Sequence, residues 1–161
     1  DSLFQPVFKG EFIHLEEGMT FDLGGVSLLI IHAPGHTQGM MVPLVKEDRV
    51  AIFGDACGVF TFLFRQECSS VNVYRQTLLK LKSYENQYDR ILRHHGTCES
   101  PKSLTDENLE VAQEILNGTD EHIPFEYLGY HAFIAKQTDP QTGIRADGKS
   151  GNIVYAQDKI W

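Results

Sequence analysis

Residues 33–39 are Ala33-Pro34-Gly35-His36-Thr37-Gln38-Gly39, and they follow a nearly continuous apolar run at residues 26–31. An apolar run that ends at Pro and Gly predicts a buried strand that stops at a tight loop. The sequence therefore places His36 just beyond the end of a strand, where loops often carry functional side chains.

Two other segments predict the same geometry. Asp55 follows Gly54 and the apolar run at residues 50–53, and His95 follows the short strand expected at residues 90–93. A glycine lies next to each of the three residues, so the backbone can turn sharply there. Two imidazoles and a carboxylate are suitable ligands for Zn²⁺, with Fe²⁺ and Mn²⁺ as alternatives, and a carboxylate can bridge two ions. We therefore predict His36, Asp55 and His95 as metal ligands, with His94 as the alternative to His95.

Each of these features alone is typical of an ordinary turn, so the prediction depends on their combination. Cys57 lies two residues after Asp55 and is either a further ligand or a small buried side chain. His122 and His131 lie near the C-terminus, where they are either surface residues or part of the wall of a substrate pocket.

Hydrophobic periodicity indicates an α/β fold. It predicts strands at residues 12–15, 26–31, 40–45, 50–53, 90–93, 127–135 and 152–156, and helices at residues 71–84 and 106–117. Ser70 and Thr105 are the expected helix N-caps, and Gly118 the glycine that ends the second helix. The last two strands are expected to form a long hairpin around residues 139–151.

Length and composition indicate one globular unit over residues 1–161, with residues 119–161 as a C-terminal extension. A net charge of −8 without a basic patch argues against nucleic-acid binding. The apolar runs are far shorter than the roughly 20 residues of a membrane helix, so we expect no membrane association. No signal peptide is visible, and an odd number of cysteines (three) without a Cys-x-x-Cys pair favours a reducing compartment and a cytoplasmic protein.

The sequence resembles the metallo-β-lactamase superfamily over about residues 10–116. The resemblance lies in the loop at residues 33–39, in Ile52-Phe53-Gly54-Asp55-Ala56, and in Ile91-Leu92-Arg93-His94-His95-Gly96. It implies an αββα sandwich, of which this chain supplies the second half as one mixed sheet with covering helices. It also implies that His36 is the third histidine ligand, Asp55 the metal-bridging aspartate and His95 the last histidine ligand of a two-zinc site.

The superfamily's His-x-His-x-Asp-His motif is absent. None of the seven histidines has a neighbour at that spacing; they are His14, His32, His36, His94, His95, His122 and His131. The resemblance thus implies a metal-dependent hydrolase of a small-molecule ester, amide, thioester or phosphoester, with only part of the dinuclear site on this chain. By itself the chain is expected to be inactive. The alternative is a non-catalytic half-domain that folds with a second copy or with the missing N-terminal half.

Overall fold

The computed structural model describes residue 10 and residues 12–161, so the first nine residues of the expected unit lie outside the described part. Its strands are β1 (Thr20–Asp22), β2 (Ser27–His32), β3 (Met41–Val45), β4 (Val50–Gly54), β5 (Thr61–Leu63), β6 (Arg90–Arg93), β7 (Glu99–Ser100), β8 (Ile123–Tyr127), β9 (Tyr130–Ile134) and β10 (Ile153–Tyr155). The helices are α1 (Val71–Ser83) and α2 (Ser103–Asn117), with short 3₁₀ turns η1 (Glu85–Gln87) and η2 (Gln157–Lys159).

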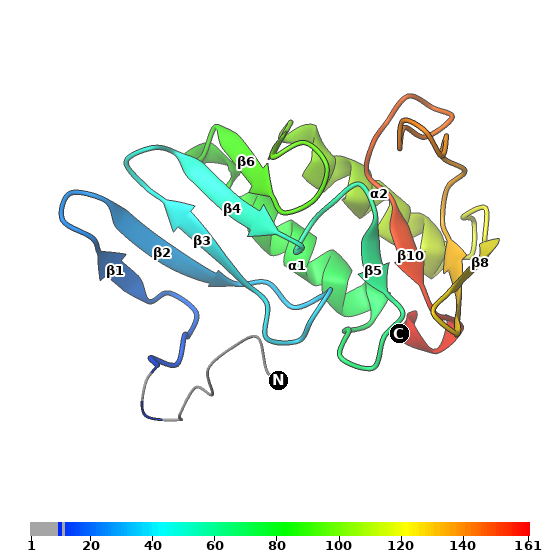
Figure 1. The fold of residues 1–161 in the computed structure, drawn as a ribbon, viewed down its shortest axis with the longest axis horizontal. Coiled ribbons are helices and arrows are strands. Elements are labelled where there is room, and N and C mark those ends of the chain that lie inside the picture. The colour runs from blue at the N-terminus through cyan, green and yellow to red at the C-terminus, as the bar shows by residue number, and fades with distance from the viewer. Residues whose placement is uncertain (1–9, 11) are drawn as a thin grey trace, which may run out of the picture.

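The described strands form two mixed sheets. The larger has six strands in the order β1-β2-β3-β4-β6-β7, with β4 and β6 parallel and the other pairs antiparallel. The smaller has four strands in the order β5-β10-β9-β8, with β5 and β10 parallel. Both helices lie on the same side of these sheets (Figure 1). The α/β class is confirmed, although the sequence predicted one mixed sheet where the structure has two.

One continuous core lies between the helices and both sheets. Its largest fully buried members come from α1, α2 and from strands of either sheet; they include Ile31, Leu44, Phe53, Leu63, Tyr74, Leu78, Leu81, Ile91, Leu104 and Ile153. Because the core is shared, burial of apolar surface holds the two sheets in one unit.

The hairpin expected at residues 40–53 is confirmed. β3 and β4 pair antiparallel with Val45 opposite Val50; burial alternates along β3, whereas β4 is buried except at Ile52. The helix expected at residues 71–84 is also confirmed, because α1 begins after Ser70, whose Oγ accepts a hydrogen bond from the backbone N–H of Val73 at 3.2 Å.

The second helix starts earlier than the sequence indicates. α2 begins at Ser103, so Thr105 lies within the first turn with a buried side chain and is not the N-cap. Leu104 is 1% exposed, and burying it in the core extends the helix toward the N-terminus. The C-terminal end agrees with the prediction, since Gly118 adopts the left-handed conformation with φ of 66°.

Two strand predictions are wrong in detail. Residues 12–15 form no strand and are exposed, and the first strand is β1, which pairs with β2 through Thr20 opposite Leu29. Residues 127–135 are interrupted at Leu128 and Gly129, both with positive φ, which form the two-residue turn of the β8–β9 hairpin. A leucine at such a turn gives no sequence signal, because Asn, Asp and Gly are the residues that usually adopt this conformation.

The predicted pairing of the C-terminal strands is confirmed. β9 pairs with β10 antiparallel, with Ile134 opposite Val154, and the connecting residues 135–152 form a long loop. β1, β5, β7 and β8 are strands that the sequence did not predict. The partner of β5 is β10, which lies about ninety residues further along the chain, with Thr61 opposite Ile153. No helix in the described residues has the length and apolar character needed to cross a membrane.

Candidate metal site and its cavity

The loop that carries His36 rests on helix α1. Thr77 Oγ1 donates a hydrogen bond to the Pro34 carbonyl at 2.6 Å, and the Ser69 N–H donates to the Gly35 carbonyl at 2.8 Å. The Gly35 α-carbon lies directly against the ring of Tyr74. These contacts hold the backbone before His36 in one position.

The imidazole of His36 is oriented by a strand of the smaller sheet. Its Nδ1 lies 3.1 Å from the Phe62 carbonyl oxygen in β5. A carbonyl can only accept, so Nδ1 carries the proton and Nε2 keeps a free lone pair. A backbone carbonyl on one ring nitrogen is the usual way in which a protein orients a metal-binding histidine. The contact therefore favours the tautomer of His36 in which Nε2 is free to bind a metal.

Asp55 follows β4 at an irregular strand end. The register between β4 and β6 shifts between Ile52 and Gly54, and Gly54 has a positive φ of 55°. A β-carbon at Gly54 would come within 2.9 Å of His94 Cε1, so the His94 ring lies against the glycine backbone. Glycine is thus favoured at position 54 both by its conformation and by the close approach of a ring.

Both adjacent histidines approach the Asp55 carboxylate. His95 Nε2 is 3.3 Å from Asp55 Oδ1, and His94 Nδ1 is 3.6 Å from Asp55 Oδ2. His95 lines the cavity beside Asp55, whereas His94 does not. The alternative ligand His94 thus lies only slightly farther from Asp55 than the preferred ligand His95, and the cavity distinguishes the two more clearly than the distances do.

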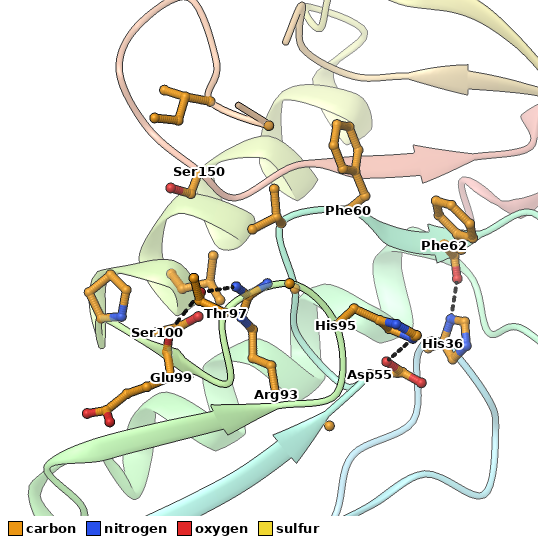
Figure 2. A pocket seen from close by; sticks show the side chains of 18 of the residues that line it. His36, Asp55, Phe60, Phe62, Arg93, His95, Thr97, Glu99, Ser100 and Ser150 are labelled. Atoms are coloured by element: carbon orange, nitrogen blue, oxygen red, sulfur yellow. Dashed lines mark hydrogen bonds and ion pairs between the residues drawn. The ribbon is translucent and has the colours of Figure 1, made fainter. Parts of the chain in front are cut away.

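A cavity of about 760 Å³ contains all three predicted ligands, His36, Asp55 and His95. Figure 2 shows the His95 ring directed toward Asp55 and the His36 ring beneath the Phe62 carbonyl. Their donor types match a zinc site in chemistry. Within the described residues, however, no three His, Cys, Asp or Glu side chains are already gathered around one point. His36, Asp55 and His95 are therefore suitable ligands in type, and further ligands would be needed to complete a metal site.

Several cavity residues were not expected from the sequence. They are contributed by the β4–β5 segment, by the β6–α2 segment and by the extension: Gly58, Val59, Phe60, Phe62, Arg93, Gly96, Thr97, Glu99, Ser100, Pro101, Leu104, Thr142, Gly143, Ile144 and Ser150. Arg93 could have been found from the sequence, because it directly precedes the paired histidines His94 and His95. The remainder comes from chain segments that only the tertiary fold brings together.

The extension forms part of the cavity wall, but not through its histidines. The wall residues Thr142, Ile144 and Ser150 lie in the β9–β10 loop. His122 instead hydrogen-bonds the Tyr155 hydroxyl at 2.7 Å, and His131 pairs with Glu126 at 3.2 Å, and neither lines the cavity. The hypothesis that these two histidines line a substrate pocket is therefore not supported.

Cys57 is a core residue. It is completely buried, its Sγ accepts a hydrogen bond from Asn108 Nδ2 at 3.4 Å, and burial raises the pKa of the thiol to about 12. A thiol that keeps its proton is a poor metal ligand, because metals bind the thiolate. The structure favours the small buried side chain over the ligand.

A family model described as the metallo-beta-lactamase superfamily matches residues 3–88, which is more than half of the chain. The chain belongs to the metallo-β-lactamase superfamily. The matched part contains His36 and Asp55, whereas His94 and His95 lie beyond it. No curated protein matches the sequence.

Three solved structures share the fold of this chain over part of their length. A metallo-β-lactamase superfamily protein from the archaeon Sulfolobus tokodaii aligns with a TM-score of 0.54 and 20% identity, over 80% of this chain and 48% of that one. A stereoselective inverting sec-alkylsulfatase from Pseudomonas sp. aligns with a TM-score of 0.55 and 11% identity, over 65% and 18% of the two chains. A family protein from Thermus thermophilus aligns with a TM-score of 0.50 and 18% identity, over 65% and 36%. The metallo-β-lactamase fold is thus present as a partial domain, because this chain spans less than half the length of these three structures.

Proposed function

We propose that this chain is part of a metal-dependent hydrolase in which His36, Asp55 and His95 bind one side of a dinuclear zinc site. The observation that carries the proposal is the position of His95 Nε2, 3.3 Å from the Asp55 carboxylate in a cavity that His36 also lines. The family match supports a metallohydrolase-type fold, and the ligand set and the reaction are our inference.

Each of the three side chains has a defined part in this proposal. His36 presents Nε2, since its Nδ1 is held by the Phe62 carbonyl. Asp55 would hold the metals through its carboxylate, and His95 would supply a nitrogen, since its Nε2 lies 3.3 Å from Asp55 Oδ1. When bound, the metals would act as Lewis acids and lower the pKa of a coordinated water toward neutrality. The bond cleaved would be that of an ester, amide, thioester or phosphoester.

The cavity favours a small-molecule substrate. Its volume of about 760 Å³ lies within the usual range for small-ligand sites, roughly 300–1,000 Å³. The net charge of −8 disfavours polyanions, so we propose no nucleic-acid substrate or partner.

Zinc titration of the purified chain tests the proposal. We expect partial occupancy in wild type, because three ligands on one side hold a metal weakly. His36→Ala and Asp55→Asn should each lose the remaining binding, whereas His131→Ala, which removes an exposed histidine outside the cavity, should not. Iron and manganese titrations identify the preferred ion.

The outcomes separate the alternatives clearly. No metal binding by wild type, or binding that survives in both ligand variants, would contradict the proposed ligand set. Two tightly held metals per chain would contradict the partial site. Hydrolysis of 4-nitrophenyl acetate, assayed in the same samples, is expected to remain near the rate without protein.

A second candidate is a half-domain that folds with a partner. Both helices cover one face of the six-stranded sheet (Figure 1). Side chains alternate between the two faces of a strand, and several half-buried apolar side chains that are not part of the core lie on the opposite face. They include two cross-strand pairs, Leu28 opposite Val45 and Ile52 opposite Leu92. An apolar face of this kind is typical of a surface that another chain segment covers. We propose that the missing N-terminal half or a second copy covers it.

Sedimentation distinguishes these two partners. A dimer that dissociates in the Val45→Lys and Ile52→Lys variants supports the second copy. A monomer that gains stability only when an N-terminal half-domain is added supports the missing half. A stable monomer that is unaffected by the lysine substitutions and by an added N-terminal half-domain would contradict both kinds of partner.

A further inference from the structure

Arg93 is the last residue of β6, and its side chain lines the cavity between the His95 loop and the start of α2. Its Nη2 donates a hydrogen bond to Thr97 Oγ1 at 2.9 Å, and Nε is buried without any partner. In Figure 2 the guanidinium lies beside Thr97, away from Asp55. The cavity therefore has a cationic end and a metal-ligand end.

No carboxylate neutralises this guanidinium within residues 10 and 12–161. Glu99 lines the same cavity, but its two oxygens accept hydrogen bonds from Arg90 at 3.0 and 2.8 Å. Asp55 is in contact with His94 and His95. Since part-buried cations are normally paired, an unpaired arginine inside a cavity indicates a place for an anion.

Groups near Arg93 also favour the binding of a small anion. Ser100, Pro101 and Leu104 line the cavity at the N-terminal end of α2, where the helix dipole is positive. Val59, Phe60 and Ile144 supply apolar wall nearby, which suits the carbon skeleton of a small ligand. The cavity thus combines one cation with apolar walls.

We propose that Arg93 binds a carboxylate group of the substrate and so sets the specificity of this site for anionic small molecules. The planar guanidinium matches the planar carboxylate and can donate two parallel hydrogen bonds to it. A single negative charge fits better than a multiply charged group, because Asp55 and Glu99 also line the cavity. The inference rests on the proposed hydrolase function, for which it names the substrate class.

Ligand binding to the metal-free chain tests this proposal separately from metal binding. The probes are 3-phenylpropionate and its uncharged amide, 3-phenylpropionamide, titrated in the presence of a chelator. Wild type should bind the carboxylate at least about tenfold more tightly than the amide, as expected for charge-assisted hydrogen bonds. A failure of the zinc titration leaves this measurement unaffected.

Variants of Arg93 test whether this residue causes the preference for the carboxylate over the amide. Arg93→Gln should bind both probes about as weakly as wild type binds the amide, and unchanged amide binding would show that the cavity is intact. Arg93→Lys should keep part of the preference, because it retains the charge without the planar fork. The matched control is Arg65→Gln, which removes an arginine that pairs with Glu67 outside the cavity and should leave the preference intact.

Equal binding of the two probes by wild type would overturn the proposal. A carboxylate preference that survives in Arg93→Gln would also overturn it. If Arg93→Gln fails to fold, the ¹⁵Nε resonance of Arg93 in wild type decides, since it should shift on adding the carboxylate and not on adding the amide. A resonance that does not respond to the carboxylate counts against the proposal.

Discussion

Gly35 lies against the ring of Tyr74 so closely that a β-carbon at position 35 would come 2.6 Å from Tyr74 Cδ2. Tyr74 cannot easily move aside, because it is fully buried and its hydroxyl lies 3.1 Å from Thr61 Oγ1. The residue before His36 is therefore positioned by the packing of α1. This contact connects the metal-ligand loop to the core.

Gly35→Ala should lower the free energy of unfolding by about 1–3 kcal/mol, the usual cost of overpacking a core. It should also weaken zinc binding, because the His36 loop must move. Gly39→Ala is the matched control in the same loop, since nothing lies within 4 Å of its added β-carbon, and it should change stability by less than about 0.5 kcal/mol. Urea denaturation of wild type and of both variants measures stability, and zinc titration measures binding. Equal stability of the two variants would contradict the contact.

His95→Ala should weaken zinc binding more than His94→Ala. His95 shares the cavity with His36 and Asp55, whereas His94 lies against Gly54 outside it. Loss of a ligand should reduce affinity by at least the 10–100-fold that is typical of losing a supporting residue, and loss of His94 by about threefold or less. Competition with a chromogenic chelator measures both affinities, and the reverse order would assign His94 as the ligand.

Glu107 holds the cavity-wall loop onto α2. Its Oε2 accepts hydrogen bonds from the N–H groups of Ser150 and Gly151, both at 2.8 Å. Burial acts to raise the pKa of Glu107, but these two hydrogen bonds, the Ser103 hydroxyl and the charge of Arg145 outweigh it, and the pKa is lowered. A pKa that is lower in the folded chain means that the ionised form adds stability above the unfolded value.

That stabilisation is expected to disappear as the pH falls from about 4.5 through the lower folded pKa. Glu107→Gln should lower the free energy of unfolding at pH 7 by roughly 1 kcal/mol and flatten its dependence on pH below about 5. Glu110→Gln is the control, because Glu110 makes an exposed pair with Lys149 of the same loop and should matter little. Identical pH profiles for wild type and Glu107→Gln would show that Glu107 does not act in this way.

Cys98 should react with a thiol reagent in the native chain, whereas Cys57 should react only after unfolding. Cys98 is exposed, and Cys57 is fully buried with a pKa raised by burial to about 12. Cys57→Ala should therefore leave the zinc affinity unchanged, although it alters the core. Mass spectrometry of labelled peptides and zinc titration measure the two results, and rapid native labelling of Cys57 would show that it reaches the cavity.

Elements whose partners lie nearby in the sequence were predicted well. The β3–β4 hairpin has a short connection between two apolar strands, and α1 has a capping serine and an apolar face, so local patterns were sufficient. The start of α2 and the strand β5 were not predicted, because each depends on distant partners. Leu104 joins the shared core, and β5 pairs with β10 from the other end of the chain.

The sequence by itself determined the family resemblance and the positions of His36, Asp55 and His95 after three strands, because strand ends and glycine turns are local features. Only the tertiary structure decided which nitrogen of His36 is free, that β5 orients it, and that Arg93 lines the same cavity without a carboxylate partner among the described residues. Those properties arise where segments far apart in sequence pack against one another. Packing of that kind depends on how the whole core is filled, which short-range patterns do not encode.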